Sequence, residues 1–464
     1  MQPVTGSGKS DEWNGRNTLV VGLGDTGLSA VRFLAKRGAI VRAADSRAQP
    51  PALDALRAER PGIALHLGPF DVQALAGVDA IVASPGVALR EPFLRAAVAR
   101  GIEVVGDVEV FARALAADRS PARVIGITGT NGKSTVTALA AAMGGAAGLR
   151  TVAAGNIGLP VLDALDAPDA GAVELFVLEL SSYQLETTSS LACDAAVMLN
   201  LTQDHLDRYD GMDDYARAKA RIFAHAKRRV VNRDDPWSRG MADSGAFSFG
   251  LGVPHGDGEW GLDAQRTVLM RGSIPLLPLE DMAMQGLHNA ANALAAHALM
   301  SAIDAPADAL ARALRTFRGL PHRVELVAEA HGVRFFDDSK GTNVGATVAA
   351  LEGFRAPVVL IAGGDGKGQD FTPLRPAVES RARAVVLIGR DAPAIEQALG
   401  ASGVRLERAA TMDAAVETAF ELAREGDAVL LSPACASFDM FRNYKHRGDV
   451  FAAAARAIAE RTTH

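Results

Sequence analysis

Gly126-Ile-Thr-Gly-Thr-Asn-Gly-Lys-Ser134 is the stretch of sequence that decides the fold of this chain. It follows an apolar run at residues 124–125 and precedes an alanine-rich segment of helical composition at residues 136–143. A strand, a glycine-rich turn and a helix in this order form a cradle for phosphate, because the N–H groups of the turn and the helix N-terminus face the anion. Lys133 supplies a cation, and the hydroxyl of Ser134 is suited to bind Mg²⁺.

The spacing of this loop is unusual. The common phosphate loop has the form G-x4-G-K-[ST]. Here Ile127 stands where the first glycine of that pattern would be, and Gly129 lies inside the loop instead. A search for the common pattern would miss this loop, so the departure points to a particular family.

The composition sets the size of the protein and excludes some partners. A length of 464 residues predicts about three domains, and 48% hydrophobic residues are enough to fill their cores. Lysine and arginine number 48 against 54 aspartates and glutamates, which gives a net charge of −6 without a basic run. This balance argues against nucleic acid as a partner.

The N-terminus and the cysteines indicate the cellular setting. Residues 1–15 are polar and glycine-rich, without the apolar core of a signal peptide, and we expect a disordered tail. Gly6-Ser-Gly-Lys-Ser10 looks like a phosphate loop, but no strand precedes it. No apolar stretch is long enough to cross a bilayer, so we expect a cytoplasmic protein without membrane insertion. Cys193 and Cys435 stand in apolar company, which favours buried thiols over a disulfide or a reactive site.

Strands alternate with helices in three blocks, which we assign to residues 16–111, 112–320 and 321–464. Strands are expected at residues 18–21, 40–44, 80–83, 173–180, 195–200, 333–336, 358–362, 384–388 and 428–431, and helices at residues 28–37, 215–224 and 289–300. Residues 245–280 are turn-rich with short alternating runs, which predict a small antiparallel sheet. The order predicts an α/β fold of three domains: an N-terminal Rossmann-like domain, a central mononucleotide-binding domain with a parallel sheet, and a C-terminal Rossmann-like domain. Ligands are expected at the carboxyl ends of the parallel strands.

The first block carries Gly22-x-Gly24-x-x-Gly27 directly after a strand, and Asp45 ends the next strand. This spacing fits a dinucleotide-binding fingerprint, in which the carboxylate binds a ribose hydroxyl. On the motif alone, three interpretations stay open: a nicotinamide or flavin enzyme, a protein for another nucleotide or phosphate, and a tight turn needed only for packing.

Three polar residues of the second block are candidates for chemistry. Glu179 ends an apolar strand, and a carboxylate beside a phosphate loop predicts a Mg²⁺ ligand, although this cluster also fits the cap of the next helix. His205 stands between Asp204 and Asp207, where metal or substrate contact and a structural role are both open. Lys219 lies on a predicted helix, and the residues alone favour a solvated surface lysine, because a protonated lysine cannot bind Mg²⁺.

The third block places polar turns at three strand ends, at residues 338–343, 363–367 and 432–437. The first turn offers the cation of Lys340 and the hydroxyl of Thr342, and the second is a glycine-rich turn suited to an anion. Three polar turns at strand ends of one domain are hard to explain by packing, so we expect a ligand there.

Together these motifs resemble the Mur ligase superfamily. The resemblance covers nearly the whole chain after residue 15, and the unusual phosphate loop is the superfamily's own form. It rests on residues 22–27, 45–47, 84–86, 129–134, 155–158, 178–186, 204–208, 215–219, 288–289, 319–323, 338–343, 363–367 and 432–437. The resemblance implies an ATP-dependent ligase of peptidoglycan synthesis that forms an amide through an acyl phosphate. Within the superfamily, it is similar to the members that add D-glutamate to UDP-N-acetylmuramoyl-L-alanine.

The resemblance implies a UDP-linked substrate, not NAD, on the first block. The residues that it assigns to this substrate are Gly24, Thr26, Gly27, Asp45, Ser46, Arg47, Ser84, Pro85, Gly86 and Asn156. The residues that it assigns to ATP are Gly129, Thr130, Asn131, Gly132, Lys133, Ser134, Thr135, Asn289, Arg323 and Asp338.

The resemblance also reverses the interpretation of Lys219. It implies that CO₂ carbamylates this lysine, which turns a cation into a carboxylate suited to Mg²⁺. Two Mg²⁺ sites are implied, which Mn²⁺ can also fill: one at Ser134 and Glu179, the other at His205 and Lys219. Lys133, His205 and Lys219 are the implied catalytic residues.

The incoming glutamate is assigned to the third block. The implied residues are Lys340, Thr342, Lys367, Ser437, Phe438 and Tyr444, and related proteins often have phenylalanine near the last position. Because ATP and glutamate would lie on different domains, we expect a mobile third domain, in a monomer. An L-glutamate-adding variant, a folylpolyglutamate synthase-like ligase and a non-catalytic nucleotide-binding protein stay open as alternatives.

Overall fold

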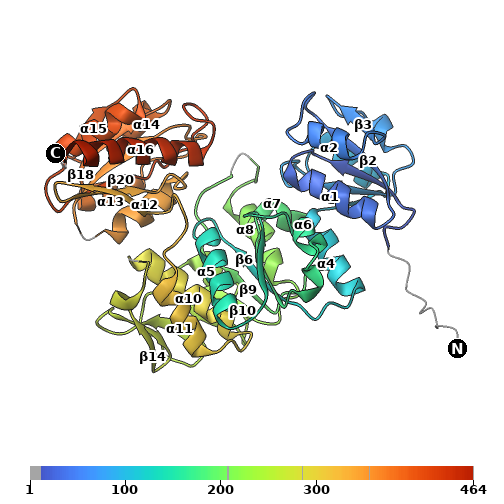
Figure 1. The fold of residues 1–464 in the computed structure, drawn as a ribbon, viewed down its shortest axis with the longest axis horizontal. Helices are drawn as coiled ribbons and strands as arrows, with labels where there is room; N and C mark the ends of the chain where they lie inside the picture. Colours follow the sequence, from blue (N-terminus) through green and yellow to red (C-terminus); the bar gives the residue numbers. More distant parts are fainter. Residues whose placement is uncertain (1–11, 206–207, 285, 355, 463–464) are drawn as a thin grey trace.

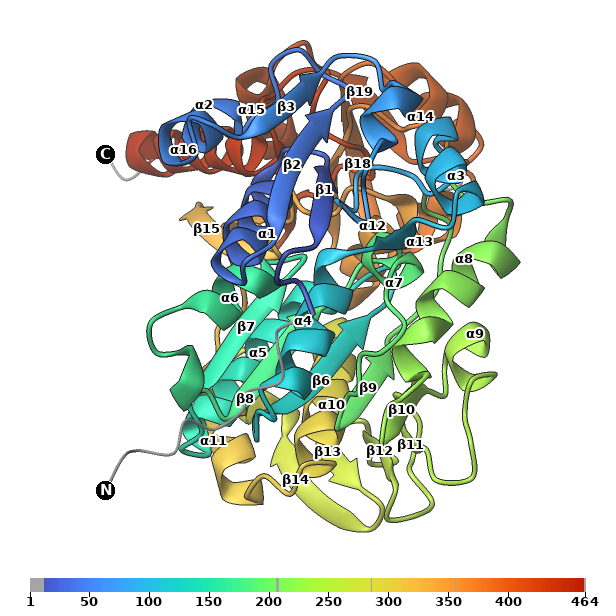
Figure 2. The same ribbon diagram turned by 90° about the vertical axis from the view of Figure 1, so that its right-hand side faces the viewer.

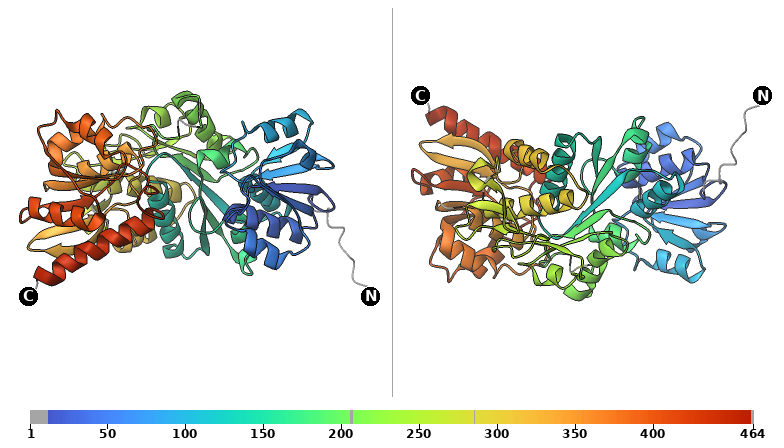
Figure 3. Two further views of the ribbon diagram at one scale, coloured as in Figure 1. Left: turned by 90° about the horizontal axis from the view of Figure 1, so that it is seen from above. Right: turned by 90° about the horizontal axis from the view of Figure 1, so that it is seen from below.

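The computed structural model describes residues 12–205, 208–284, 286–354 and 356–462. Three α/β domains follow one another along the molecule, with the N-terminal and C-terminal domains at opposite ends (Figure 1). Views from above and below show the same order (Figure 3). Of the tail predicted at residues 1–15, residues 1–11 lie outside the described residues. Trp13 is buried against the first domain, so ordered structure begins before residue 16.

The N-terminal domain is built on a five-stranded parallel sheet in the order β3-β2-β1-β4-β5. Val20 of β1 packs in the core beneath α1, and Leu19 and Val21 pack in the core beneath α3. This alternation is typical of a strand covered by helices on both faces. The elements are β1 (Asn17–Val21), α1 (Asp25–Lys36), β2 (Ile40–Asp45), α2 (Leu53–Glu59), β3 (Ala64–Leu67), β4 (Ala80–Ala83), α3 (Pro92–Ala99) and β5 (Glu103–Val105).

The central domain is built on a nine-stranded sheet in the order β14-β13-β12-β11-β10-β9-β6-β8-β7, part of which faces the viewer in Figure 2. Ile125 and Ile127 of β6 pack beneath α5, α10 and α11, and Phe176 of β8 packs on the other face beneath α4 and α6. The elements are α4 (Asp107–Ala117), β6 (Arg123–Thr128), α5 (Lys133–Ala146), β7 (Thr151–Gly155), α6 (Val161–Asp166), β8 (Leu175–Glu179), α7 (Ser182–Glu186), β9 (Ala195–Met198), α8 (Met212–Ala220), β10 (Arg229–Asn232), α9 (Pro236–Arg239), β11 (Phe247–Phe249), β12 (Glu259–Leu262), β13 (Val268–Arg271), β14 (Ile274–Pro278), α10 (Leu287–Ser301) and α11 (Ala307–Thr316).

The antiparallel strands predicted within residues 245–280 are present, but they extend the central sheet instead of forming a separate one. β11 and β12 continue the parallel part, and the antiparallel pairings are those of β13 with β12 and with β14. The predicted helix at residues 215–224 is shorter than expected, because α8 ends at Ala220 and a 3₁₀ turn follows at Arg221–Phe223.

The C-terminal domain has a six-stranded sheet in the order β15-β16-β20-β17-β18-β19. All pairs are parallel except β15 with β16, and β15 was not predicted. Its burial pattern explains the omission, because most of its side chains are exposed or half-buried. The elements are β15 (Glu325–Ala330), β16 (Val333–Asp337), α12 (Val344–Gly353), β17 (Val358–Gly363), α13 (Leu374–Arg381), β18 (Ala382–Ile388), α14 (Ala392–Leu399), β19 (Arg405–Arg408), α15 (Met412–Leu422), β20 (Ala428–Leu431) and α16 (Tyr444–Thr462).

Helix α4 joins the first two domains. It crosses the boundary predicted at residues 111 and 112, and Phe111 packs edge-on against Phe176 of the central sheet, with ring centroids 5.2 Å apart. The division at residue 112 therefore stays a prediction. Cys193 and Cys435 are free and buried, as predicted. Among the described residues, no helix is long and apolar enough to cross a membrane.

Asp107 at the start of α4 gives a prediction about stability. It is buried, its Oδ2 accepts a hydrogen bond from Gln184 Nε2 at 3.3 Å, and its Oδ1 has no hydrogen-bond partner. Burial raises the pKa of this carboxyl to about 6. Because the folded state disfavours the ionised form, this group lowers the free energy of unfolding as pH rises between about 4 and 6, by at most ~3 kcal/mol.

We expect Asp107→Asn to raise the melting temperature at about pH 8 and to raise it less at about pH 5, since the neutral amide removes the cost of ionisation. Thermal unfolding followed by circular dichroism at both pH values measures the difference. An equal shift at the two pH values would contradict the assignment.

Candidate active site

The predicted phosphate loop connects β6 to α5. Gly132 is the residue before α5 and has φ 83°, a left-handed conformation, and a Cβ there would lie 2.7 Å from Asn292 Oδ1. Lys133 Nζ donates to the carbonyl oxygens of Gly129 and Thr130, at 2.8 Å each. Burial lowers the pKa of Lys133, while nearby Glu179 raises it. The loop therefore has the conformation and the cation of a phosphate cradle.

Glu179 ends β8, directly beside the phosphate loop, because it pairs with Ile127 of β6. It is buried, its Oε1 accepts a hydrogen bond from Asn156 Nδ2 at 2.8 Å, and its Oε2 has no hydrogen-bond partner. A buried carboxylate oxygen without a partner is costly unless a cation is bound, so this residue fits the predicted metal site. Asn156, which was predicted to contact the UDP-linked substrate, donates this hydrogen bond to Glu179 and so helps to fix the carboxylate.

Lys219 of α8 is buried, so the interpretation of a solvated surface lysine is wrong. Its Nζ donates to the carbonyl oxygen of Gly129 at 2.9 Å and to Thr128 Oγ1 at 3.3 Å. Burial lowers its pKa well below the ordinary value, and the charge of Lys133 lowers it further. A neutral primary amine is the form of lysine that reacts with CO₂, so the environment fits the predicted carbamate.

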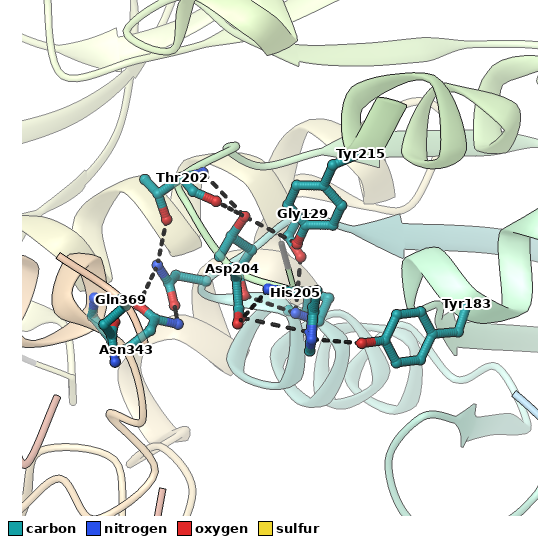
Figure 4. A network of polar contacts seen from close by, with 12 residues as sticks. Gly129, Tyr183, Thr202, Asp204, His205, Tyr215, Asn343 and Gln369 are labelled. Carbon is teal, nitrogen blue, oxygen red and sulfur yellow. Dashed lines mark hydrogen bonds and ion pairs between the residues drawn. The ribbon is translucent and has the colours of Figure 1, made fainter. Parts of the chain in front are cut away.

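His205 lies beside these groups, in a network shown in Figure 4. Its Nδ1 is 2.7 Å from Tyr183 Oη, and its Nε2 is 3.6 Å from Asp204 Oδ2. Burial lowers the pKa of His205, while Asp204 raises it. The negative charge of Asp204 also raises the pKa values of Lys133 and Lys219. Asp204 was not among the site residues predicted from the sequence. Asp207 lies outside the described residues.

The C-terminal domain reaches the phosphate loop through two contacts. Arg323 Nη2 donates to Ser134 Oγ at 2.7 Å. The side-chain amides of Asn131 and Asn343 pair with each other, at 3.1 and 3.4 Å between their N and O atoms. Asn343 also caps α12, because its Oδ1 accepts a hydrogen bond from the N–H of Ala346.

The other residues assigned to ATP lie at this junction or at the start of α5. Asp338 follows β16, and its carboxylate accepts a hydrogen bond from Ser432 Oγ at 2.7 Å. Burial raises the pKa of Asp338 to about 7. Asn289 lies in the first turn of α10, where its Oδ1 accepts a hydrogen bond from Asn292 Nδ2 at 3.4 Å. Thr135 is buried in α5, next to Ser134.

The residues assigned to the UDP-linked substrate lie at the carboxyl ends of β1, β2 and β4, except Asn156, which follows β7 of the central domain. Asp45 is buried, and its oxygens accept hydrogen bonds from Arg47 Nε and Nη2, at 2.8 and 2.7 Å, and from the N–H of Leu23 at 2.7 Å. Burial alone would raise the pKa of Asp45, but these hydrogen bonds have the larger combined effect and lower the pKa to about 2. Asp45 therefore shapes its own turn, and a contact with substrate stays a prediction.

Close packing explains two residues of the same turns. A Cβ on Gly27 would lie 1.9 Å from the carbonyl oxygen of Gly22, so this position requires glycine. Ser84 Oγ donates to that carbonyl at 2.7 Å. The remaining members lie in the same turns: Gly24 and Thr26 at the start of α1, Ser46 after β2, and Pro85 and Gly86 after β4.

The predicted glutamate residues follow strands β16, β17 and β20 of the C-terminal domain, except Tyr444, which is the first residue of α16. Lys340 Nζ lies 4.0 Å from the ring centroid of Tyr444, and burial, with the charge of Arg323, lowers its pKa to about 8. The side chain of Phe438 is exposed. Thr342 donates its N–H to the carbonyl of Lys340 at 2.8 Å. Lys367 follows β17, and Ser437 follows β20 and is buried.

Sequence reasoning missed Arg447, which holds two of these turns together. The side chain of Arg447 is buried. Its Nε donates to Ser339 Oγ at 2.9 Å, and its Nη2 donates to the carbonyl oxygen of Ser339 at 2.7 Å. Its Nη1 donates to the carbonyl oxygen of Cys435 at 3.0 Å. Burial lowers its pKa to about 10. No sequence motif indicates the role of Arg447, because its partners lie 12 and 108 residues away in the chain.

The fold and the site define a mononucleotide-binding α/β protein whose phosphate loop is contacted by Arg323 and Asn343 of the C-terminal domain. Three family models match the chain: the Mur ligase MurD-like N-terminal domain at residues 16–106, the Mur ligase middle domain at residues 127–300, and the Mur ligase glutamate ligase domain at residues 322–435. The chain belongs to the Mur ligase family, which confirms the resemblance.

Similar proteins agree with the family. The chain is 58% identical to a UDP-N-acetylmuramoylalanine–D-glutamate ligase of Methylobacillus flagellatus, over 96% of this chain and 98% of that protein. It is 56% identical to the protein of the same description from Thiobacillus denitrificans, over 96% of this chain and 97% of that protein. Among solved structures, MurF from Acinetobacter baumannii matches 97% of this chain and 92% of its own, with a TM-score of 0.59 and 18% identity. That likeness confirms the three-domain fold.

The amide pair between Asn131 and Asn343 gives a prediction about the predicted mobility of the third domain. Asn343→Ser keeps a side chain that caps α12 but cannot reach Asn131. We expect the variant to have a larger radius of gyration in solution scattering than the wild type, and weaker ATP binding, because one link between the domains is lost.

The matched control is Thr411→Ser, which exchanges the capping residue of α15 far from the phosphate loop. This control should scatter as the wild type does. An unchanged radius of gyration for Asn343→Ser, both without ligands and with ATP and substrate, would show that the pair does not hold the domains together.

Proposed function

We propose that this chain is an ATP-dependent ligase that joins D-glutamate to UDP-N-acetylmuramoyl-L-alanine in peptidoglycan synthesis, as a cytoplasmic monomer. The observation that carries the proposal is the cluster of Lys133, Lys219 and the half-satisfied Glu179 around the phosphate loop, reached by Arg323 from the next domain. The choice of substrates is supported by the curated relatives, which are named for this reaction and are 50–58% identical over at least 95% of the chain.

The first step would join a carboxylate to the γ-phosphoryl group of ATP, so two anions must meet. Lys133 lies in the loop that cradles the phosphates, and Arg323 donates to Ser134 at its edge. Both residues can offset the charge that develops during phosphoryl transfer. The product would be an acyl phosphate and ADP.

Divalent cations fit the same cluster. Glu179 and Ser134 would hold one Mg²⁺, and His205 and carbamylated Lys219 would hold another, with Mn²⁺ as a substitute. Bound there, these ions supply neutralisation of phosphate charge. The carbamate would form when the neutral Nζ of Lys219 attacks CO₂, which makes an N–C bond, releases one proton and leaves a carboxylate.

The second step would join the amine of glutamate to the acyl carbon and expel phosphate. The polar turns of the C-terminal domain supply Lys340 and Lys367 for the carboxylates of glutamate. The Nζ of Lys340 lies over the ring of Tyr444, and its pKa is lowered to about 8, so an anionic partner would stabilise its charged form. Arg447 would keep the turns in place.

The reaction itself is the test of this proposal. We expect the protein to release ADP and phosphate when UDP-N-acetylmuramoyl-L-alanine, ATP, Mg²⁺ and D-glutamate are all present. A coupled ADP assay measures this release, with L-glutamate as the parallel arm and each omitted substrate as a control. Turnover with L-glutamate alone would support the variant ligase, and turnover with neither would refute the assignment.

Lys219 gives a second prediction. We expect Lys219→Ala to lower kcat by at least ~10³-fold, because the variant lacks the carboxylate that the carbamate would supply. Formate or acetate should restore part of the activity, since either anion can occupy the space of the lost carboxylate.

A ¹³C NMR spectrum of the wild type in ¹³C-bicarbonate should show a carbamate resonance that Lys219→Ala lacks. Wild-type turnover in CO₂-depleted buffer should fall, whereas the rescued variant should be insensitive to CO₂. Full activity of Lys219→Ala without added anion would contradict the role.

A further inference from the structure

We propose that Tyr183 is a positioning residue that orients the imidazole of His205, so that Nε2 faces the divalent cation held with Lys219. This inference rests on the proposed function, because that function places a cation beside His205. Tyr183 belongs to none of the predicted sites, and its hydroxyl bonds the imidazole directly (Figure 4).

The contact between the two rings is specific. Tyr183 Oη lies 2.7 Å from His205 Nδ1, and the ring centroids are 4.9 Å apart at an interplanar angle of 59°. The hydroxyl therefore meets the imidazole at its edge, where the nitrogen is. Within the part of the chain that the structure describes, Nδ1 has this hydroxyl as its hydrogen-bond partner, which leaves Nε2 on the side of Asp204.

The local sequence places Tyr183 for this purpose. It lies four residues after Glu179, in the first turn of α7, so the strand end that carries the predicted metal ligand also carries the tyrosine. Ser181 and Gln184 form a capping box that fixes this turn, with Gln184 N–H donating to Ser181 Oγ at 3.2 Å. A capped first turn holds the direction of its side chains.

A second contact holds the tyrosine ring. The guanidinium of Arg208 lies 4.0 Å from the centroid of Tyr183, and it is fixed by Glu186 at 2.7 Å and by the carbonyl of Pro85 at 2.8 Å. Cation–π contact with this arginine, whose side chain is 9% exposed, adds to the rigidity of the ring. Tyr183 therefore connects the imidazole to the turn after β4 in the N-terminal domain.

The chemistry of the phenol suits both states of the imidazole. A neutral imidazole has one N–H and one lone pair, and only the nitrogen with the lone pair can bind a cation. If Nε2 binds the cation, Nδ1 must carry the hydrogen and donate it to an acceptor. The tyrosine oxygen can accept that hydrogen, or donate its own hydrogen to Nδ1 when Nε2 carries one toward Asp204. The hydroxyl thus keeps the ring in one orientation whichever nitrogen is protonated.

Histidine ligands of metals commonly donate the second ring N–H to such a partner, and loss of the partner weakens metal binding by about 10–100-fold. The neighbouring tyrosines do not offer the same contact. Tyr215 Oη lies 3.3 Å from Thr130 Oγ1, and Tyr209 Oη donates to Glu186. Tyr183 is therefore the tyrosine to change, and Tyr209 is its matched control.

The test compares Tyr183→Phe with Tyr209→Phe, each of which removes one hydroxyl from the same aromatic cluster. Mn²⁺ binding is measured by electron paramagnetic resonance in bicarbonate buffer, without substrates. We expect Tyr183→Phe to weaken Mn²⁺ binding at the His205 site about 10-fold, and Tyr209→Phe to bind as the wild type does. In turnover, Tyr183→Phe should raise the Mg²⁺ concentration needed for half-maximal rate, with the KM values for ATP and glutamate unchanged.

A second measurement reports the orientation itself. In protein labelled with ¹⁵N-histidine, Mg²⁺ should convert the wild-type His205 to the form with hydrogen on Nδ1 at a concentration that leaves Tyr183→Phe a mixture of both forms. Wild-type Mn²⁺ affinity and an unmixed spectrum in Tyr183→Phe would overturn the inference, as would equal losses in the two variants. These outcomes do not depend on turnover, so a wild type that binds Mn²⁺ but fails to ligate D-glutamate would refute the proposed function alone.

Discussion

One carbonyl oxygen, that of Gly129, accepts hydrogen bonds from two lysines. Lys133 Nζ lies 2.8 Å from it and Lys219 Nζ lies 2.9 Å from it, and Lys219 is buried while Lys133 is half-buried. Two charged ammonium groups so close together would repel each other strongly in a medium of low dielectric constant. The pair is tolerable if one amine is neutral, and burial favours the neutral form more at Lys219, which is the more buried of the two. Burial beside the shared carbonyl thereby favours Lys219 as the amine that is available for chemistry.

The sequence predicted most of the fold because the parallel strands are short apolar runs followed by polar turns. Residues 80–83 and 428–431 match β4 and β20, and these strands are buried throughout. Prediction failed for β15, whose exposed side chains have no clear period, and for the place of residues 245–280 in the central sheet. Strand pairing depends on contacts between distant segments, which a local pattern does not contain.

The candidate site was predictable where a motif encodes a backbone shape, and unpredictable where burial decides. Gly27 and Gly132 were recognised as parts of glycine-rich motifs, and their surroundings show why glycine is needed. Lys219 could not be recognised from its own helix, since a lysine in a helix is usually exposed and only the tertiary fold buries it. Arg447 escaped notice for the same reason, because its carbonyl partners come from distant turns.

Both domains contribute charged groups of both signs to the junction. Glu179, Asp204, Lys133 and Lys219 belong to the central domain, whereas Asp338 and the three cations Arg323, Lys340 and Arg447 belong to the C-terminal side. Burial lowers the pKa values of all three cations, which means that each is held in the fold at a cost to its charged form. An anionic ligand at the junction would reduce that cost, and it would do so only while the two domains are in contact. Affinity for such a ligand and association of the domains are therefore expected to rise together, since both depend on the same buried cations.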